Sequence, residues 1–150
     1  MIRVQTDDFD IGAEVAALTE GRTDIGAIVT FSGLVRDASG GGTVTSMELE
    51  HYPGMTEKEL ARIEAAACSR WPLQATLIVH RVGRLAPGDN IVLVVTASAH
   101  REAAFEAASF LMDYLKTRAP FWKREEGENE ARWVDARESD GKAASRWERR

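Results

Sequence analysis

Alternating and continuous runs of apolar residues predict strands along much of the chain. Over 25–36, β-branched residues recur in alternation, and the odd-numbered positions, Phe31 among them, are predicted to share one face, with Arg36 on the opposite face. The segment 91–98 is apolar on both faces, which indicates a central strand. The same criteria predict further strands at 2–5, 43–51, 75–83, 121–125 and 131–135.

The segment that follows Pro53 and Gly54 predicts a long helix. Thr56 and Glu59 have the spacing of a capping box, so we expect Thr56 to cap the first turn. Apolar residues recur at helical spacing and predict one buried stripe, formed by Leu60, Ile63, Ala67 and Trp71. Cys68 adjoins this stripe and is interpreted as a small buried thiol.

A second long helix is predicted over 99–117, and Pro120 ends it because proline disfavours a helical conformation in the residue before it. Short connections at 37–42 and 84–90 imply antiparallel strand pairs, since parallel pairs need long crossovers. We therefore predict an α+β fold rather than a doubly wound parallel sheet. With 150 residues and no evident linker, the chain is predicted to be one domain over 1–150, with shorter helices near 11–18 and 141–147.

The composition narrows the possible functions. There are 24 Asp and Glu against 19 Lys and Arg, and this acidic balance argues against bulk nucleic-acid binding. Cys68 is the one cysteine, so no intrachain disulfide and no zinc-ligand spacing is possible, and we expect no metal and no cofactor. His51 and His80 have apolar neighbours on predicted strands and are interpreted as structural. The lack of a signal-peptide pattern or a long apolar run predicts a cytoplasmic protein.

Against this acidic total, the stretch LKTRAPFWKRE at 115–125 gathers basic side chains around a proline and two aromatic residues. We expect Phe121 and Trp122 to exclude water from the ammonium group of Lys123. Desolvation lowers the pKa of a lysine and allows it to serve as an acid, a base or a nucleophile near neutral pH. The basic residues of the stretch are Lys116, Arg118, Lys123 and Arg124.

Three more basic residues stand at the ends of predicted elements. Arg36 ends a strand before a glycine-rich loop, and His100 and Arg101 begin the second long helix, where an anion is favourable. Lys116 closes the same helix roughly 25 Å away, so it cannot meet His100 and Arg101 within one straight helix. Either Lys116 caps the helix C-terminus, or a site is assembled across a subunit interface.

Several segments together resemble the large, catalytic subunit of molybdopterin synthase. They are GAIVTFSGLVRD (26–37), LEHYPGMTEKEL (49–60), HRVGRLAPGD (80–89), SAHREAAFEA (98–107), MDYLKTRAPFWKRE (112–125) and RWVDARESD (132–140). The resemblance implies a sulfurtransferase of molybdenum cofactor biosynthesis. It implies an α+β fold of the α/β-hammerhead type, with a mixed, largely antiparallel sheet and packed helices.

The resemblance also implies a reaction and its partners. Two sulfurs would pass from the C-terminal thiocarboxylate of a small ubiquitin-like subunit to cyclic pyranopterin monophosphate (precursor Z), forming the molybdopterin dithiolene. Two large subunits would form a central homodimer with one small subunit at each end, a heterotetramer.

By the same resemblance, Lys116 and Lys123 would be catalytic. The substrate would be bound by Leu34, Val35, Arg36, His100, Arg101, Lys116, Lys123, Arg124 and Glu125. Leu34 stands where a polar residue is expected in some relatives, so it would act through its backbone or apolar surface. Two rival hypotheses are a non-catalytic scaffold, disfavoured because both lysines are present, and a small RNA- or nucleotide-binding module, disfavoured by the acidic total.

Overall fold

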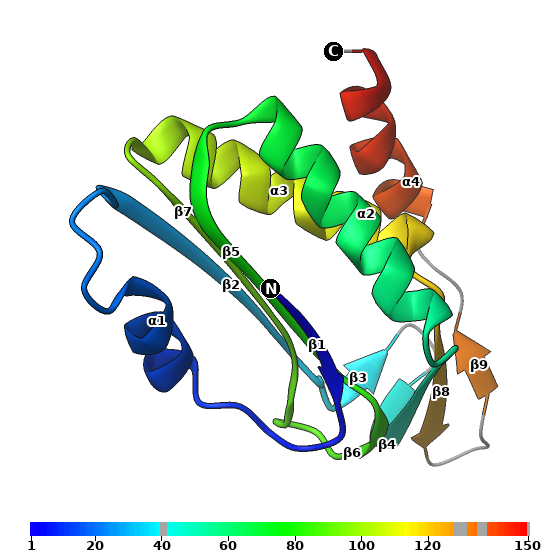
Figure 1. Ribbon diagram of the computed structural model, residues 1–150. Helices are drawn as coiled ribbons and strands as arrows, with labels where there is room; N and C mark the ends of the chain where they lie inside the picture. Colours follow the sequence, from blue (N-terminus) through cyan, green and yellow to red (C-terminus); the bar gives the residue numbers. More distant parts are fainter. Residues whose placement is uncertain (40–41, 128–131, 135–137, 150) are drawn as a thin grey trace.

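A sheet with helices on both faces forms one part of the molecule (Figure 1). The computed structural model describes residues 1–39, 42–127, 132–134 and 138–149. The sheet runs, in spatial order, through β1 (Ile2–Gln5), β5 (Leu73–Arg81), β7 (Asn90–Ser98) and β2 (Ala27–Leu34). The β1–β5 pair is parallel and the other two pairs are antiparallel. One face is covered by α2 (Met55–Arg70) and α3 (Arg101–Arg118), the other by α1 (Ile11–Thr19).

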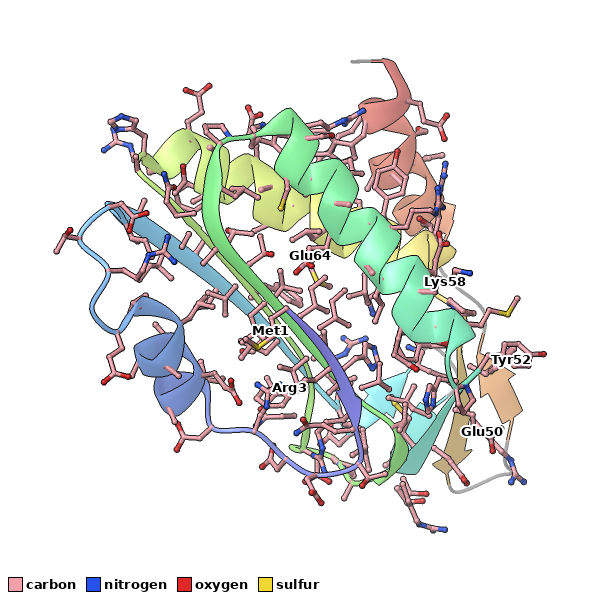
Figure 2. The ribbon with its side chains drawn as sticks, in the orientation of Figure 1. Met1, Arg3, Glu50, Tyr52, Lys58 and Glu64 are labelled. Atoms are coloured by element: carbon pink, nitrogen blue, oxygen red, sulfur yellow. The ribbon has the colours of Figure 1, made fainter. Side chains whose placement is uncertain are left out.

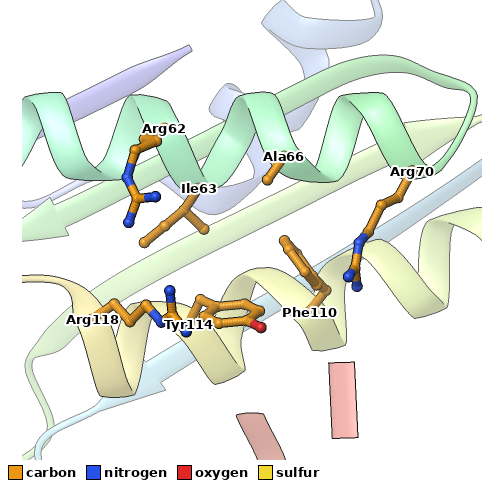
Figure 3. Close-up of a pocket in the computed structure, with 7 residues that line it drawn as sticks. All are labelled: Arg62, Ile63, Ala66, Arg70, Phe110, Tyr114 and Arg118. Carbon is orange, nitrogen blue, oxygen red and sulfur yellow. The ribbon is translucent and has the colours of Figure 1, made fainter. Parts of the chain in front are cut away.

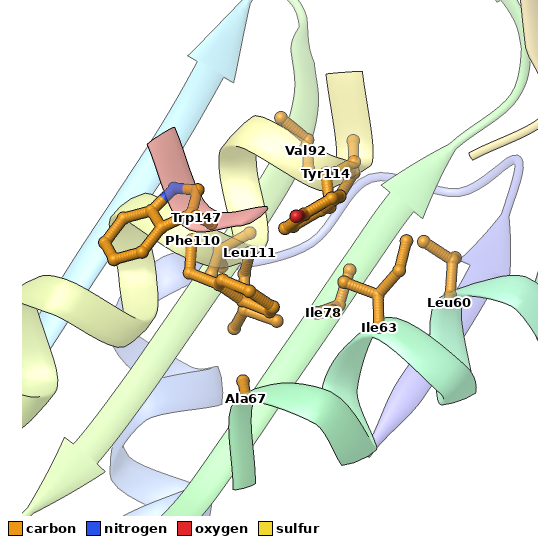
Figure 4. Packing of buried hydrophobic residues seen from close by; sticks show 11 residues of the cluster. Leu60, Ile63, Ala67, Ile78, Val92, Phe110, Leu111, Tyr114 and Trp147 are labelled. Carbon is orange, nitrogen blue, oxygen red and sulfur yellow. The ribbon is translucent and has the colours of Figure 1, made fainter. Parts of the chain in front are cut away.

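Both faces of this sheet are buried, which explains why its central strands are apolar at successive positions. Successive side chains of a strand point to opposite faces. In β5, Ile78 packs with Leu60 and Leu111 under α2 and α3 (Figure 4), whereas Leu77 and Val79 pack on the side of α1. Full burial of one such side chain contributes about 1.5–3 kcal/mol.

A second sheet stands at the end of the first, beside the start of α2 and the end of α3 (Figure 1). It contains β3 (Ala38–Ser39), β4 (Gly42–His51), β8 (Phe121–Gly127) and β9 (Arg132–Val134), and β6 (Gly83–Leu85) also pairs with β4. Where the two sheets join, a small buried cluster, called here the junction cluster, is formed by Val35, Met47, Leu49 and Leu85.

The two ends of the chain are tied to the helical layer. The amino group of Met1 donates to Glu64 of α2 at 2.6 Å and to the Thr76 carbonyl at 3.0 Å (Figure 2). At the other end come α4 (Glu138–Ser145) and a 3-10 turn, η1 (Arg146–Arg149), whose Trp147 packs against Phe110 of α3 and Trp71.

The predicted α+β architecture of the hammerhead type is confirmed. Each predicted strand and helix is present within the described residues, with bounds that differ by a few residues. The antiparallel pair predicted across 84–90 is confirmed as β5–β7, but the pair predicted across 37–42 is wrong, because β2 and β4 belong to different sheets. α3 ends at Arg118, as the position of Pro120 predicts, and Ala119 has an extended conformation.

The capping role expected for Thr56 is wrong. α2 is capped by Gly54, whose φ of 86° suits glycine, and the N–H of Gly54 donates to the Glu57 carboxylate at 2.7 Å. The helix therefore begins one residue before Thr56, and this shift turns the threonine side chain into the interior, where it is fully buried.

The burial prediction for Cys68 is also wrong, and Phe31 of β2 is partly exposed. Cys68 is exposed, because it follows the buried Ala67 by one residue and so lies about 100° further around α2. Phe31 is 40% exposed, because β2 is the outer strand of its sheet and its side chains are covered less completely than those of β5 and β7.

Candidate active site

The segments that carry most of the predicted basic site residues meet where the two sheets join. Val35 packs with Leu49 in the junction cluster, and Leu49 is the partner of Lys123 across the β4–β8 pair. Arg36 directly follows Val35, and α3 leads into β8 through a turn of two residues, so these ends lie at the same junction. The predicted basic site residues on these segments are Arg36, Lys116, Lys123 and Arg124.

Successive side chains of strand β8 lie on opposite faces of the sheet. Phe121 and Lys123 lie on the face of His51 and Leu49, whereas Trp122 and Arg124 lie on the opposite face with Glu50 and Glu48. Lys123 is half-buried and Arg124 is exposed. The Trp122 ring contacts Tyr52, with centroids 4.3 Å apart. The expectation that both aromatic residues shield Lys123 is therefore wrong for Trp122, because adjacent strand residues point in opposite directions.

The turn between Lys116 and Lys123 is bonded to the start of α2. Thr56 donates its hydroxyl hydrogen to the Pro120 carbonyl at 3.0 Å, and the same oxygen accepts the Tyr52 N–H at 3.0 Å. Lys116 itself is exposed on the last turns of α3. The two lysines are thus carried by separate elements whose connection is held from a third one.

His80 of β5 links the two lysine-bearing segments. Its ring stacks on Phe121, with centroids 3.7 Å apart and planes inclined by 15°. The pKa of His80 is lowered from 6.5 to about 4, chiefly by burial and to a smaller extent by the electrostatic effects of Lys116 and His51, although the bond to the Arg81 carbonyl opposes the shift. His80 is therefore neutral near pH 7, and its predicted structural role is consistent with this burial.

The remaining predicted cations lie at the other end of the molecule. His100 is the N-cap of α3 and Arg101 its first residue, and both are exposed. The 18 residues of α3 place them roughly 27 Å from its last turn. Likewise, in the β2–β7 pair Ala27 is opposite Ser98 but Leu34 is opposite Asn90, so Arg36 is also at the far end. One chain does not bring His100 and Arg101 to the two lysines.

The flanking residues differ in what they can contact. Leu34 is 50% exposed beside an irregularity in the β2–β7 pairing. Val35 is 3% exposed, and its N–H and carbonyl are bonded to Asp89 and Gly88 at 2.9 and 2.8 Å. Val35 therefore anchors its neighbours rather than presenting groups to a ligand. Glu125 pairs with Met47 through the backbone, and its side chain lies outside the described part of the chain.

A cavity of about 160 Å³ between α2 and α3 has a different character (Figure 3). Its three arginines already have structural partners: Arg62 pairs with Glu59, Arg70 donates to the Trp147 carbonyl at 2.8 Å, and Arg118 pairs with Glu148 at 3.2 Å. The guanidinium group of Arg118 also lies 4.8 Å from the centre of the Tyr114 ring. This arrangement accounts for Arg118 as a residue that fastens η1 to α3.

The described part of the chain contains neither a metal-binding cluster nor a membrane-spanning helix. Across 1–39, 42–127, 132–134 and 138–149, three or more His, Cys, Asp or Glu side chains nowhere come together in a metal-binding arrangement. In the same ranges, none of the helices has both the length and the apolar character needed to cross a bilayer.

Comparison with known proteins identifies the family of the chain. The family model described as "MoaE protein" matches residues 4–118. The chain belongs to the MoaE family. Curated catalytic subunits of molybdopterin synthase from Mesorhizobium japonicum and Ralstonia nicotianae are each 60% identical to it, over 97% of this chain and over 92% and 83% of their own lengths.

Solved structures of the MoaE family agree with this assignment. The Burkholderia ambifaria MoaE protein has a TM-score of 0.85 at 56% identity, over 99% of this chain and 97% of that one. A complex of subunits 1 and 2 of molybdopterin-converting factor from Helicobacter pylori has a TM-score of 0.72 over 91% and 90%, and at 19% identity this likeness shows the fold alone. The resemblance seen in the sequence is confirmed as membership of the MoaE family of molybdopterin synthase catalytic subunits.

Two residues at the junction were not recognised as site residues from the sequence of this MoaE-family chain. Thr56 has the spacing of a helix cap, and His80 sits in an apolar strand. Thr56 contacts Pro120 and His80 contacts Phe121, and each partner is at least 41 positions away along the chain. No local pattern reports such contacts.

Proposed function

We propose that this chain transfers two sulfurs from the C-terminal thiocarboxylate of a small ubiquitin-like subunit to cyclic pyranopterin monophosphate, forming the molybdopterin dithiolene. The observation that carries the proposal is the meeting of α3 and β8, which gathers Lys116 and Lys123 beside Arg36 in a chain of net charge −5. Membership of a family of catalytic subunits supports the same conclusion.

The two lysines are the catalytic groups of this proposal. A thiocarboxylate sulfur attacks a side-chain carbon of the pterin and forms a carbon–sulfur bond, while the oxygen substituent on that carbon takes up a proton and leaves. Cleavage of the acyl–sulfur bond by water then releases the carrier as a carboxylate. Each transfer needs a proton donor and acceptor, and lysine ammonium groups beside a half-buried strand face can serve in either role. Lys123 lies on such a face, and Lys116 of α3 is close enough to act electrostatically on His80, whose ring stacks on Phe121 of the same strand.

The cations nearby suit an anionic substrate. The cyclic phosphate would be bound by Arg36, Arg124, His100 and Arg101, since charge-assisted hydrogen bonds to guanidinium groups are among the strongest available. Leu34 adds exposed apolar surface, Val35 holds the strand end in place, and Glu125 flanks the site.

A homodimer reconciles these roles with the separation of the two groups of residues. We propose that His100 and Arg101 of one subunit complete the site of the other, because a single chain holds them roughly 27 Å from the end of α3. The outer strand β2 supports an association of copies, since it exposes three large apolar residues: Ile28, Phe31 and Leu34. One small subunit at each end would give a heterotetramer, and the Helicobacter pylori complex supports such a partner. Residues 1–150 would form one domain, and the protein would act in the cytoplasm.

The decisive experiment is reconstitution of the chain with a thiocarboxylated small subunit and cyclic pyranopterin monophosphate, with molybdopterin as the measured product. We expect Lys116→Ala and Lys123→Ala each to lower the rate by at least about 100-fold, the usual worth of a positioned acid–base group. Lys58→Ala is the matched control, because Lys58 is an exposed lysine on α2 (Figure 2). Retention of full activity in both site variants would contradict the assignment.

A further inference from the structure

We propose that Thr56 and His80 are positioning residues that together hold the turn at Ala119–Phe121 and so set the spacing of Lys116 and Lys123. This inference rests on the proposed function of the two lysines. Neither residue belongs to the set of substrate-binding or catalytic residues assigned above.

The turn between α3 and β8 is stabilised only weakly by hydrogen bonds within the turn itself. Lys116 is on α3 and Lys123 on β8, and the chain reverses between them at Ala119 and Pro120. Pro120 has no N–H to donate. Within the described residues, the backbone bond recorded at the turn is from the Phe121 N–H to the Ala119 carbonyl at 2.9 Å. A small change of backbone angles here would alter the separation of the two ammonium groups.

Thr56 holds the turn from one side. Its hydroxyl is fully buried and is engaged twice, as donor to the Pro120 carbonyl and as acceptor of the Tyr52 N–H, both at 3.0 Å. The Thr56 backbone N–H also donates to the Tyr52 carbonyl at 2.9 Å. One side chain therefore ties the β4–α2 connection to the α3–β8 turn, 64 positions apart along the chain. Buried hydroxyl groups with both functions satisfied are rigid points of a structure.

His80 holds the turn from the other side. Its ring is 5% exposed and stacks flat on the Phe121 ring, two residues before Lys123. The carbonyl of Arg81 can only accept, so the 2.8 Å contact with Nδ1 places the hydrogen on that nitrogen and fixes the ring orientation. Lys116 is close enough for its charge to act on His80. Because the His80 ring is neutral near pH 7, it does not repel the Lys116 ammonium group.

The catalytic consequence follows from geometry. Reacting groups must be held near their productive positions, and a displacement of about 1 Å can cost roughly 100-fold in rate. Removing a positioning residue should therefore lower kcat and leave KM nearly unchanged, because the cations that would bind the phosphate are not touched.

The test uses pairs of variants of the full chain in the reconstituted synthase. Thr56→Val keeps the shape but removes the hydroxyl, and Thr56→Ser restores it. Thr96→Val is the matched control, because the Thr96 hydroxyl is equally buried and donates to the Ala104 carbonyl at 2.7 Å near the opposite end of α3. We expect kcat to fall by about 10- to 100-fold in Thr56→Val and by less than about three-fold in Thr56→Ser and Thr96→Val.

A second pair covers the case in which Thr56→Val does not fold. His80→Leu removes the flat ring, and His80→Phe keeps a ring that can stack on Phe121. We expect kcat to fall by about 10-fold or more in His80→Leu and to stay within about three-fold of wild type in His80→Phe. If Lys116→Ala and Lys123→Ala are inactive, equal kcat values in His80→Leu and His80→Phe, or in Thr56→Val and Thr96→Val, would overturn the inference.

A readout without turnover separates this inference from the proposed function. Lysines carrying ¹³C-methyl groups give NMR signals that report their surroundings, and those of Lys116 and Lys123 should shift in Thr56→Val but not in Thr96→Val. Shifted signals with unchanged turnover would leave the positioning role intact and remove the lysines from the chemistry. Unshifted signals would refute the positioning role even if Lys116→Ala and Lys123→Ala are inactive.

Discussion

The two ends of α3 are built in different ways. At the C-terminal end, Lys116 is followed by the α3–β8 turn. Thr56 donates a hydrogen bond to Pro120 of this turn, and the His80 ring stacks on Phe121. At the N-terminal end, His100 caps the helix without a side-chain hydrogen bond to it, and both His100 and Arg101 are exposed. The fold therefore fixes the turn between the two lysines, whereas His100 and Arg101 at the helix start are exposed.

Electrostatics points to the same difference. A helix N-terminus carries a partial positive charge, so adjacent cations are unfavourable unless an anion binds between them. Lysine near a helix C-terminus is favourable by itself. The start of α3 is thus the end that gains most from an anionic ligand.

The largest expected effect comes from mixing two inactive variants. Lys123→Ala damages only the junction end, and the double variant His100→Ala/Arg101→Ala damages only the helix start. If each site combines the junction end of one subunit with the helix start of the other, a mixed dimer has one intact site and one doubly damaged site. Random exchange of subunits should then restore about a quarter of wild-type molybdopterin formation.

The control for this experiment is a mixture of Lys116→Ala with Lys123→Ala, whose defects both lie at the junction end. No mixed dimer of this pair has an intact site, so its activity should stay at the level of the separate variants. Equal, negligible activity in both mixtures would show that the site is not shared between subunits.

The next largest effect is expected for Arg36→Ala. Loss of a charge-assisted hydrogen bond to a phosphate costs about 1.5–3 kcal/mol, which corresponds to a rise in KM of roughly 10- to 150-fold. Because Arg36 is exposed, added salt should reduce the difference in KM between the variant and the wild type. Steady-state kinetics at two ionic strengths measures this, and a KM within two-fold of wild type at low salt would exclude Arg36 as a phosphate ligand.

An effect on stability is expected from His80. Its pKa falls from 6.5 in the unfolded chain to about 4 in the fold, so between these values the unfolded state binds the proton and the folded state does not. The contribution of neutral His80 to the free energy of unfolding is complete above pH 6.5. It is lost as the pH falls towards 4, by up to about 3 kcal/mol. Urea unfolding across this pH range should show a smaller loss of unfolding free energy in His80→Phe than in wild type as the pH falls. Identical pH profiles would contradict the buried, neutral state of His80.

The smallest effect is expected for Arg118→Ala. The ion pair of Arg118 with Glu148 is largely exposed, and such pairs contribute about 0–1 kcal/mol. We expect a loss of unfolding free energy below about 1 kcal/mol and unchanged molybdopterin formation, although Arg118 lies between the two lysines in sequence. A loss of activity comparable to that of Lys116→Ala would place Arg118 in the site after all.

Local patterns were enough to predict the elements and several features of the junction. The apolar segment at 91–98 predicted the buried strand β7, Pro120 predicted the end of α3, and the length of that helix already separated Lys116 from His100. These features depend on residues close together in the chain, where backbone propensity and side-chain periodicity act. The family of the chain could also be recognised, because its motifs occur in order over nearly the whole length.

Contacts between distant segments could not be read in this way. Thr56 has the spacing of a cap, and only the packing of α2 against the α3–β8 turn decides that its hydroxyl meets Pro120. Trp122 adjoins Lys123 in sequence, but the pairing of β8 with β4 places them on opposite faces. The sequence by itself determined which segments become helices and strands, since that depends on short-range sterics and periodicity. The tertiary structure decided which side chains share the junction, because burial and hydrogen bonding depend on partners dozens of residues away.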